Sequence, residues 1–114
     1  MGILKILQII AVIGTIGTGF ISLLWPRNIF GFTGLTAPGP RGITEIRSVL
    51  GGLFIGLGIA VFALGTHEVY QMLGIMYLAV GVVRAVSMVV DKSTEQSNII
   101  SLVVEIVFGI LLVL

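Results

Sequence analysis

Residues Thr44–Gly65 read TEIRSVLGGLFIGLGIAVFALG, an apolar segment of the length that a helix needs to cross the hydrocarbon core of a bilayer. The segment nevertheless begins with two charged side chains, Glu45 and Arg47. A charge at the centre of a membrane span costs about 2.5–3.5 kcal/mol on insertion scales. We therefore predict that the protein lies in a membrane and that its other helices provide partners for these two charges.

The composition of the whole chain also indicates lipid as its solvent. Hydrophobic residues make up 57% and charged residues 10%, whereas soluble domains average roughly 45–50% and about 25%. The mean hydropathy is +1.22. The net charge of +1 gives no sign of nucleic-acid binding, and the lack of cysteine excludes thiol catalysis and thiolate metal sites. The length of 114 residues predicts a single domain, residues 1–114.

Four apolar runs, at residues 3–24, 44–65, 70–90 and 99–114, are separated by turn signals. The first run lacks the cleavage site of a signal peptide, so we expect an uncleaved span. Four spans with short second and third connections predict an all-α fold, an integral membrane four-helix bundle of up-down-up-down topology. The basic residues Arg27, Arg41 and Lys92 would then lie on the side opposite Lys5, which favours cytoplasmic long loops.

Charged side chains on three of these spans converge in one half of the bilayer. Arg84 lies seven residues before Asp91, and Glu105 seven residues after the last loop, so both are about 10 Å deep from the same side. Their matched depth predicts that they pair. Glu45 and Arg47 enter from that side at about 3–6 Å and point to different sides of their helix, Glu45 into the bundle and Arg47 toward a flank or the headgroups. The cluster is either a structural network or a polar cavity for a ligand or protons, and the sequence leaves both open. Its predicted members are Glu45, Arg47, Arg84, Glu105 and Asp91.

Small residues recur on the same helices and predict close helix packing, because membrane helices approach closely where side chains are small. In the second span they recur every four residues on the face that carries Glu45, whereas Gly58 lies off that stripe. The predicted packing positions are Ser48, Gly52, Gly56, Gly81 and Gly109. The segment GGLFIGLG has no preceding strand and no P-loop lysine, so it is not a nucleotide motif.

Three stretches carry a resemblance to a known family: TEIRSVLGG in the second span, VGVVRAVSMVVD in the third and VVEIV in the fourth. They are similar to an uncharacterised bacterial four-span family, a domain of unknown function with DoxX-like architecture. The resemblance covers nearly the whole chain. It implies that Glu45, Arg47, Arg84 and Glu105 are recurrent charged positions, and it implies a multi-pass protein of the bacterial inner membrane. The family brings no established activity.

Three functions are compatible with these features. The favoured one is a non-catalytic accessory or scaffolding subunit of a larger membrane complex, or a bundle that binds lipid or quinone. The alternative is a small proton-coupled transporter using Glu45 and Glu105, although small multidrug exporters of similar length rely on a carboxylate in the first span, which has none here.

The third is an enzyme with one of these glutamates as general base. It ranks last, because no nucleophile, metal set or oxyanion donor accompanies the glutamates. We expect no catalytic residue, no cofactor and no metal, since His67 is the single histidine. The expected partners are membrane lipid and, alternatively, other membrane-protein subunits or a quinone.

Overall fold

The computed structural model describes residues 2–114, and within this range all regular secondary structure is helical, mostly α-helix with one 3-10 and one π-helical stretch. Four helical segments there are long and apolar enough to cross a membrane: Ile3–Leu24, Pro40–Leu64, His67–Val90 and Gln96–Val113. The all-α membrane helix-bundle class expected from the sequence is confirmed. The chain divides into two compact units, which are described separately: the residues up to Ala11 together with Gly65–Leu114, and Val12–Leu64.

The last three spans each begin three or four residues earlier than the apolar runs predicted. Local chemistry explains two of these starts. Pro40 occupies the first turn of its helix, where its fixed φ is favourable and its missing N–H is not needed. Thr66 caps the next helix, because its hydroxyl accepts a hydrogen bond from the Val69 N–H at 3.4 Å. The preceding helix ends just before Gly65, whose φ of +68° suits a glycine.

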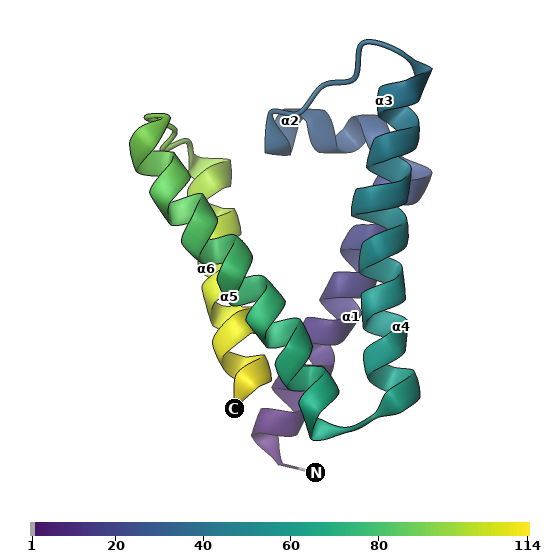
Figure 1. Cartoon of the computed structure of the whole chain (residues 1–114), viewed down its shortest axis with the longest axis vertical. Helices are drawn as coiled ribbons and strands as arrows, with labels where there is room; N and C mark the ends of the chain where they lie inside the picture. Colours follow the sequence, from purple (N-terminus) through teal and green to yellow (C-terminus); the bar gives the residue numbers. More distant parts are fainter. Residues whose placement is uncertain (1) are drawn as a thin grey trace. The chain divides into compact units, whose positions relative to one another are not determined.

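The unit Val12–Leu64 contains the greater part of α1 (Ile3–Leu24) and one long helical segment antiparallel to it. A 3-10 turn, η1 (Pro26–Ile29), and a single helical turn, α2 (Phe30–Thr33), follow α1. The long segment comprises α3 (Pro40–Glu45), η2 (Ile46–Leu53) and α4 (Phe54–Leu64) without interruption. Figure 1 shows α1 in purple beside α4 in teal.

Glycines on both helices allow α1 to approach the long segment closely. A Cβ added at Gly19 would lie 2.8 Å from Gly51 O, and one added at Gly51 would lie 3.0 Å from Leu23 Cβ. A Cβ at Gly58 would overlap Ile16 and lie 3.4 Å from Val12 O. Such contacts replace the hydrophobic drive that lipid does not provide. Gly58 is therefore on the packing face of this unit, contrary to the sequence expectation.

The predicted stripe of Ser48, Gly52 and Gly56 does not make this contact. A Cβ at Gly56 would meet no atom within 4 Å, and one at Gly52 would meet only the Arg47 carbonyl at 3.9 Å. The physical reason is η2, which is a π-helix. Its hydrogen bonds span five residues instead of four, so each residue turns the chain by less than in an α-helix. Glu45 precedes η2 and Gly56 follows it, so the α-helical period does not place them on one face.

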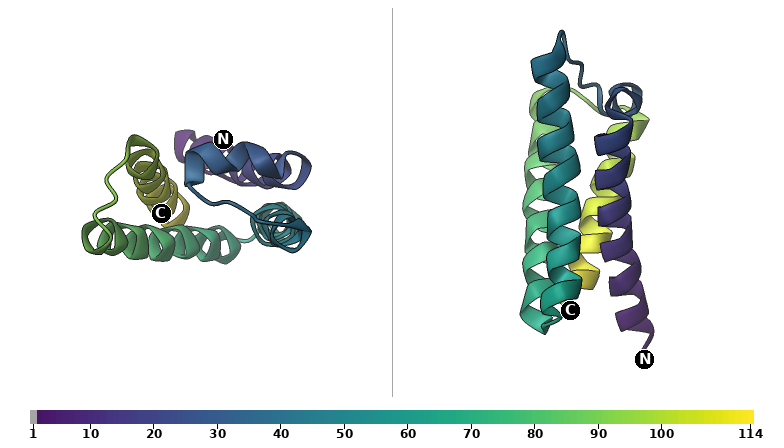
Figure 2. Two further views of the ribbon diagram at one scale, coloured as in Figure 1. Left: turned by 90° about the horizontal axis from the view of Figure 1, so that it is seen from above. Right: turned by 90° about the vertical axis from the view of Figure 1, so that its right-hand side faces the viewer.

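The other unit is built on two antiparallel helices, α5 (His67–Val90) and α6 (Gln96–Val113), which lie side by side in Figures 1 and 2. Glycines again allow the close approach. A Cβ at Gly74 would lie 2.9 Å from Gly109 O, one at Gly109 would lie 2.6 Å from Leu78, and one at Gly81 would lie 3.0 Å from Ile106. Two of the predicted packing positions, Gly81 and Gly109, thus lie at the α5–α6 contact.

The last turn of α6 receives hydrogen bonds from two glutamines on other helices. The Gln8 Nε2 donates to Leu111 O at 2.8 Å, and the Gln71 Nε2 donates to Val113 O at 3.1 Å. The last four carbonyls of a helix have no partner within the helix. These two amides therefore attach the end of α6 to the start of α1 and to α5.

Candidate functional site

A two-point ion pair between α5 and α6 forms the centre of the candidate site. The Arg84 Nε donates to Glu105 Oε1 at 2.7 Å, and the Arg84 Nη2 donates to Glu105 Oε2 at 2.8 Å. The Glu105 side chain is only 10% exposed and that of Arg84 is 32% exposed. This parallel arrangement is the strongest common geometry for a guanidinium and a carboxylate. The structure thus brings together the two residues that the sequence matched by depth.

A third residue, Asn98, completes this cluster. Its Oδ1 accepts a hydrogen bond from Arg84 Nη1 at 2.8 Å, while its Nδ2 donates to Ser93 O at 3.0 Å. Sequence reasoning did not name Asn98 as a site residue. A signal was present, because Asn98 and Glu105 are seven residues apart and so share one face of α6. We call Arg84, Glu105 and Asn98 the α5–α6 cluster.

A pocket of about 280 Å³ opens beside the α5–α6 cluster. Asp91, the residue that ends α5, lies on its wall but forms no ion pair within residues 2–114. The pocket combines a guanidinium, a carboxylate, an amide and two hydroxyls with two valines, and its lining residues are Val80, Val83, Arg84, Ser87, Asp91, Ser93 and Asn98. Such a set of donors and acceptors can hold a small polar group.

The remaining two predicted charges, Glu45 and Arg47, belong to the other unit, Val12–Leu64, and are described within it. Glu45 forms an ion pair with Arg41, one turn earlier on α3, and both side chains are more than half exposed. Arg47 is exposed on η2. Within Val12–Leu64 no ion pair or hydrogen bond joins Glu45 to Arg47.

The connection between α5 and α6 carries the last notable polar group. The Ser93 hydroxyl donates a hydrogen bond to the Glu95 carboxylate and holds the pKa of that carboxyl below its usual range.

Among residues 2–114 no group of three histidine, cysteine or carboxylate side chains could hold a metal ion. Every buried side-chain nitrogen and oxygen in the same range has a hydrogen-bond partner.

Comparison with known proteins supports the family resemblance seen in the sequence. No curated protein and no solved structure matches the chain. One family model matches it over residues 3–114, which is almost its entire length. The chain therefore belongs to the family described as a domain of unknown function (DUF4345).

Proposed function

We propose that this protein is a non-catalytic membrane protein that serves as an accessory or scaffolding subunit of a larger membrane complex, or that binds lipid or quinone. The single observation that carries this proposal is the state of Glu105. Both of its oxygens are engaged by Arg84, which is itself held by Asn98. A shielded pair compensated in this way fixes the register of two helices and leaves neither the Arg84 guanidinium nor the Glu105 carboxylate free for chemistry.

The outer face of α5 supports the same proposal. Large apolar side chains on it recur at helical spacing, and Val82, Val86 and Val89 are each at least 60% exposed. In a bilayer such a ridge faces acyl chains or a neighbouring transmembrane helix, where close packing is the main attraction. Such a ridge is the surface that an accessory subunit would present to a neighbouring helix or to lipid.

The alternative is a small proton-coupled transporter using Glu45 and Glu105. The pocket beside Arg84 favours it, because a polar cavity next to an intramembrane carboxylate could admit water or a substrate. Two observations count against it. Glu105 would have to leave both of its Arg84 contacts to bind a proton, and Glu45 is paired with Arg41 at an exposed position.

One experiment compares the two functions directly. The wild-type protein, Glu105→Gln and the loop control Glu95→Gln are extracted with their surrounding lipid, and co-purifying subunits, lipids and quinones are identified by mass spectrometry. The same proteins are placed in liposomes with a pH-sensitive dye inside. We expect a retained subunit, lipid or quinone and no proton flux above that of empty liposomes. A flux that requires Glu105, together with no retained molecule, would reject the proposal in favour of the transporter.

We further propose that the protein lies in the bacterial inner membrane with its α5–α6 connection in the cytoplasm. The support is the excess of basic residues on that side. Because the chain contains no cysteine, Lys92→Cys and His67→Cys give single labelling sites. An impermeant thiol reagent should label His67→Cys in intact cells and leave Lys92→Cys unlabelled. The reverse labelling pattern would show that the α5–α6 connection lies outside the cytoplasm.

A further inference from the structure

The unit Val12–Leu64 carries an uncompensated positive charge at its loop end. Its charged residues are three arginines and one glutamate: Arg27, Arg41, Glu45 and Arg47. Arg41 takes the single carboxylate, Glu45. Within Val12–Leu64, Arg27 and Arg47 form no ion pair and no side-chain hydrogen bond. Two guanidinium groups therefore lack an anion.

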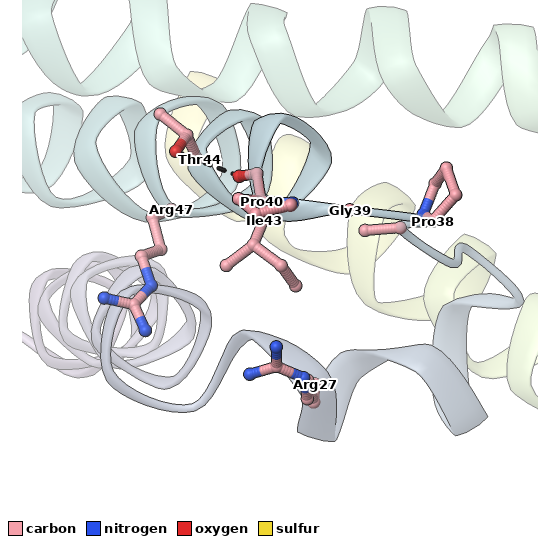
Figure 3. A pocket seen from close by; sticks show the side chains of 8 residues that line it. Arg27, Pro38, Gly39, Pro40, Ile43, Thr44 and Arg47 are labelled. Carbon is pink, nitrogen blue, oxygen red and sulfur yellow. Dashed lines mark hydrogen bonds between the residues drawn. The ribbon is translucent and has the colours of Figure 1, made fainter.

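Both of these arginines line the same pocket, whose volume is about 400 Å³. Arg27 reaches it from η1 and Arg47 from η2, and Ile43 also lines it (Figure 3). The rest of the wall is Thr44 and the short connection Ala37–Pro40. The pocket thus combines two cationic groups with several apolar side chains.

The location of the pocket along the spans matches the phosphate level of a bilayer. Arg27 follows the end of α1 by three residues and lies two residues after the exposed Trp25, which is a residue type enriched at the headgroup level. Arg47 lies seven residues into its span, about 10 Å along the helix, from where its long side chain can extend back to the interface.

We propose that this pocket binds the phosphate group of an anionic phospholipid, with Arg27 and Arg47 holding its oxygens and with Ile43 and Pro38 against the glycerol and upper acyl carbons. A guanidinium is suited to phosphate because its N–H groups can contact two oxygens at once. A zwitterionic headgroup is disfavoured, because its ammonium group would approach two uncompensated arginines. The proposal needs only that the protein is embedded in a bilayer, as the proposed function states, and it concerns a different site from the α5–α6 cluster.

The test uses the full chain, purified in detergent, with phosphatidylglycerol and phosphatidylcholine as probes and native mass spectrometry as the readout. The test variant is Arg27→Gln with Arg47→Gln. The matched control is Arg41→Gln with Lys92→Gln, which removes the same formal charge from positions that do not line the pocket. A third variant, Arg27→Lys with Arg47→Lys, keeps the charge and removes the two-point geometry.

We expect the wild-type protein and the control to retain phosphatidylglycerol in preference to phosphatidylcholine, and the test variant to bind it about tenfold more weakly or worse. The lysine variant should fall between them. If the wild type retained inorganic phosphate at millimolar concentration but showed no preference for the anionic lipid, the phospholipid would be rejected as the ligand. The pocket would then be assigned to a soluble phosphate ester. Equal retention of phosphatidylglycerol by all variants would show that this pocket is not the lipid-binding site. Neither result would alter the accessory role, which is tested by co-purification.

Discussion

Two arginine–glutamate pairs occur in this protein, and their chemistry is the same while their surroundings differ. Arg84 and Glu105 come from different helices, are 21 residues apart in sequence and are largely shielded. Arg41 and Glu45 are one turn apart on α3, with side chains that are 79% and 53% exposed. Attraction between charges is strong where water is excluded and weak where water screens it. The first pair should therefore determine whether α5 and α6 stay together, while the second should only adjust a helix end.

The largest expected effect follows from breaking the shielded pair. Glu105→Ala leaves the partly shielded Arg84 guanidinium without its carboxylate, and losses of this kind reach about 3–5 kcal/mol in well-buried soluble cases. We expect a clear drop in the detergent melting temperature. Glu95→Ala is the control, because Glu95 lies on the exposed connection, where substitutions usually change stability by less than about 0.5 kcal/mol.

A double variant separates pairing from packing at this position. If the loss comes from the stranded charge, then Arg84→Leu combined with Glu105→Ala should recover part of the stability lost by Glu105→Ala alone. No recovery would mean that the Glu105 side chain stabilises α6 through contacts other than Arg84.

The second prediction concerns the helix contact in the unit that holds the exposed pair. Gly58→Leu should destabilise the protein by about 1–3 kcal/mol, because its side chain would overlap Ile16 on α1. Gly56→Leu should be close to neutral, since nothing lies within 4 Å of a Cβ there. Folded yield and detergent melting of the two variants test this order. A larger loss for Gly56→Leu would show that the face of α4 is assigned wrongly.

The sequence predicted one unit better than the other, and the reason is helical regularity. On α5 and α6 the α-helical period is unbroken, so counting residues correctly placed Arg84 opposite Glu105 and Gly81 and Gly109 at a helix contact. In the second span the π-helix of η2 interrupts the period. Counting residues through the π-helix predicted that Gly52 and Gly56 lie on the packing face and that Gly58 does not. In the contact with α1, Gly58 packs against Ile16, whereas a Cβ at Gly52 or Gly56 would meet no atom of α1. No residue type in the η2 sequence, IRSVLGGL, predicts a π-helix.

Two further features, the ion pair of Glu45 and the hydrogen bonds to the end of α6, were not predicted from the sequence. The pairing of Glu45 with Arg41 follows the ordinary spacing of one helical turn, but the expected start of the span near Thr44 left Arg41 outside the helix. The hydrogen bonds from Gln8 and Gln71 depend on where α6 ends relative to two other helices, which a single sequence does not contain. Position along one helix is predictable, whereas contact between helices requires the register of both.

The third prediction tests those amide contacts. Gln8→Leu keeps a similar volume and removes the donor to the Leu111 carbonyl, which would then lack its side-chain partner. Hydrogen bonds between membrane helices average about 0.6 kcal/mol, so we expect a small but measurable fall in melting temperature. Gln96→Leu is the control, because Gln96 is exposed at the start of α6. Hydrogen exchange of the last turn of α6 should quicken in Gln8→Leu and stay unchanged in Gln96→Leu.

The smallest effect is expected at the exposed pair, and it completes the comparison. Glu45→Ala removes an ion pair between neighbouring turns, which contributes about 0.2–0.5 kcal/mol and weakens as salt rises. The measurement is the melting temperature of wild type, Glu45→Ala, Arg41→Ala and the double variant at low and high salt. We expect a small coupling between the two positions that salt abolishes, whereas the coupling of Arg84 to Glu105 should persist in the same buffers. If Glu45→Ala were as damaging as Glu105→Ala, exposure within its own unit would be a poor guide to the environment of Glu45. That residue would then have an important partner outside Val12–Leu64, and the two glutamates would have to be treated as one site.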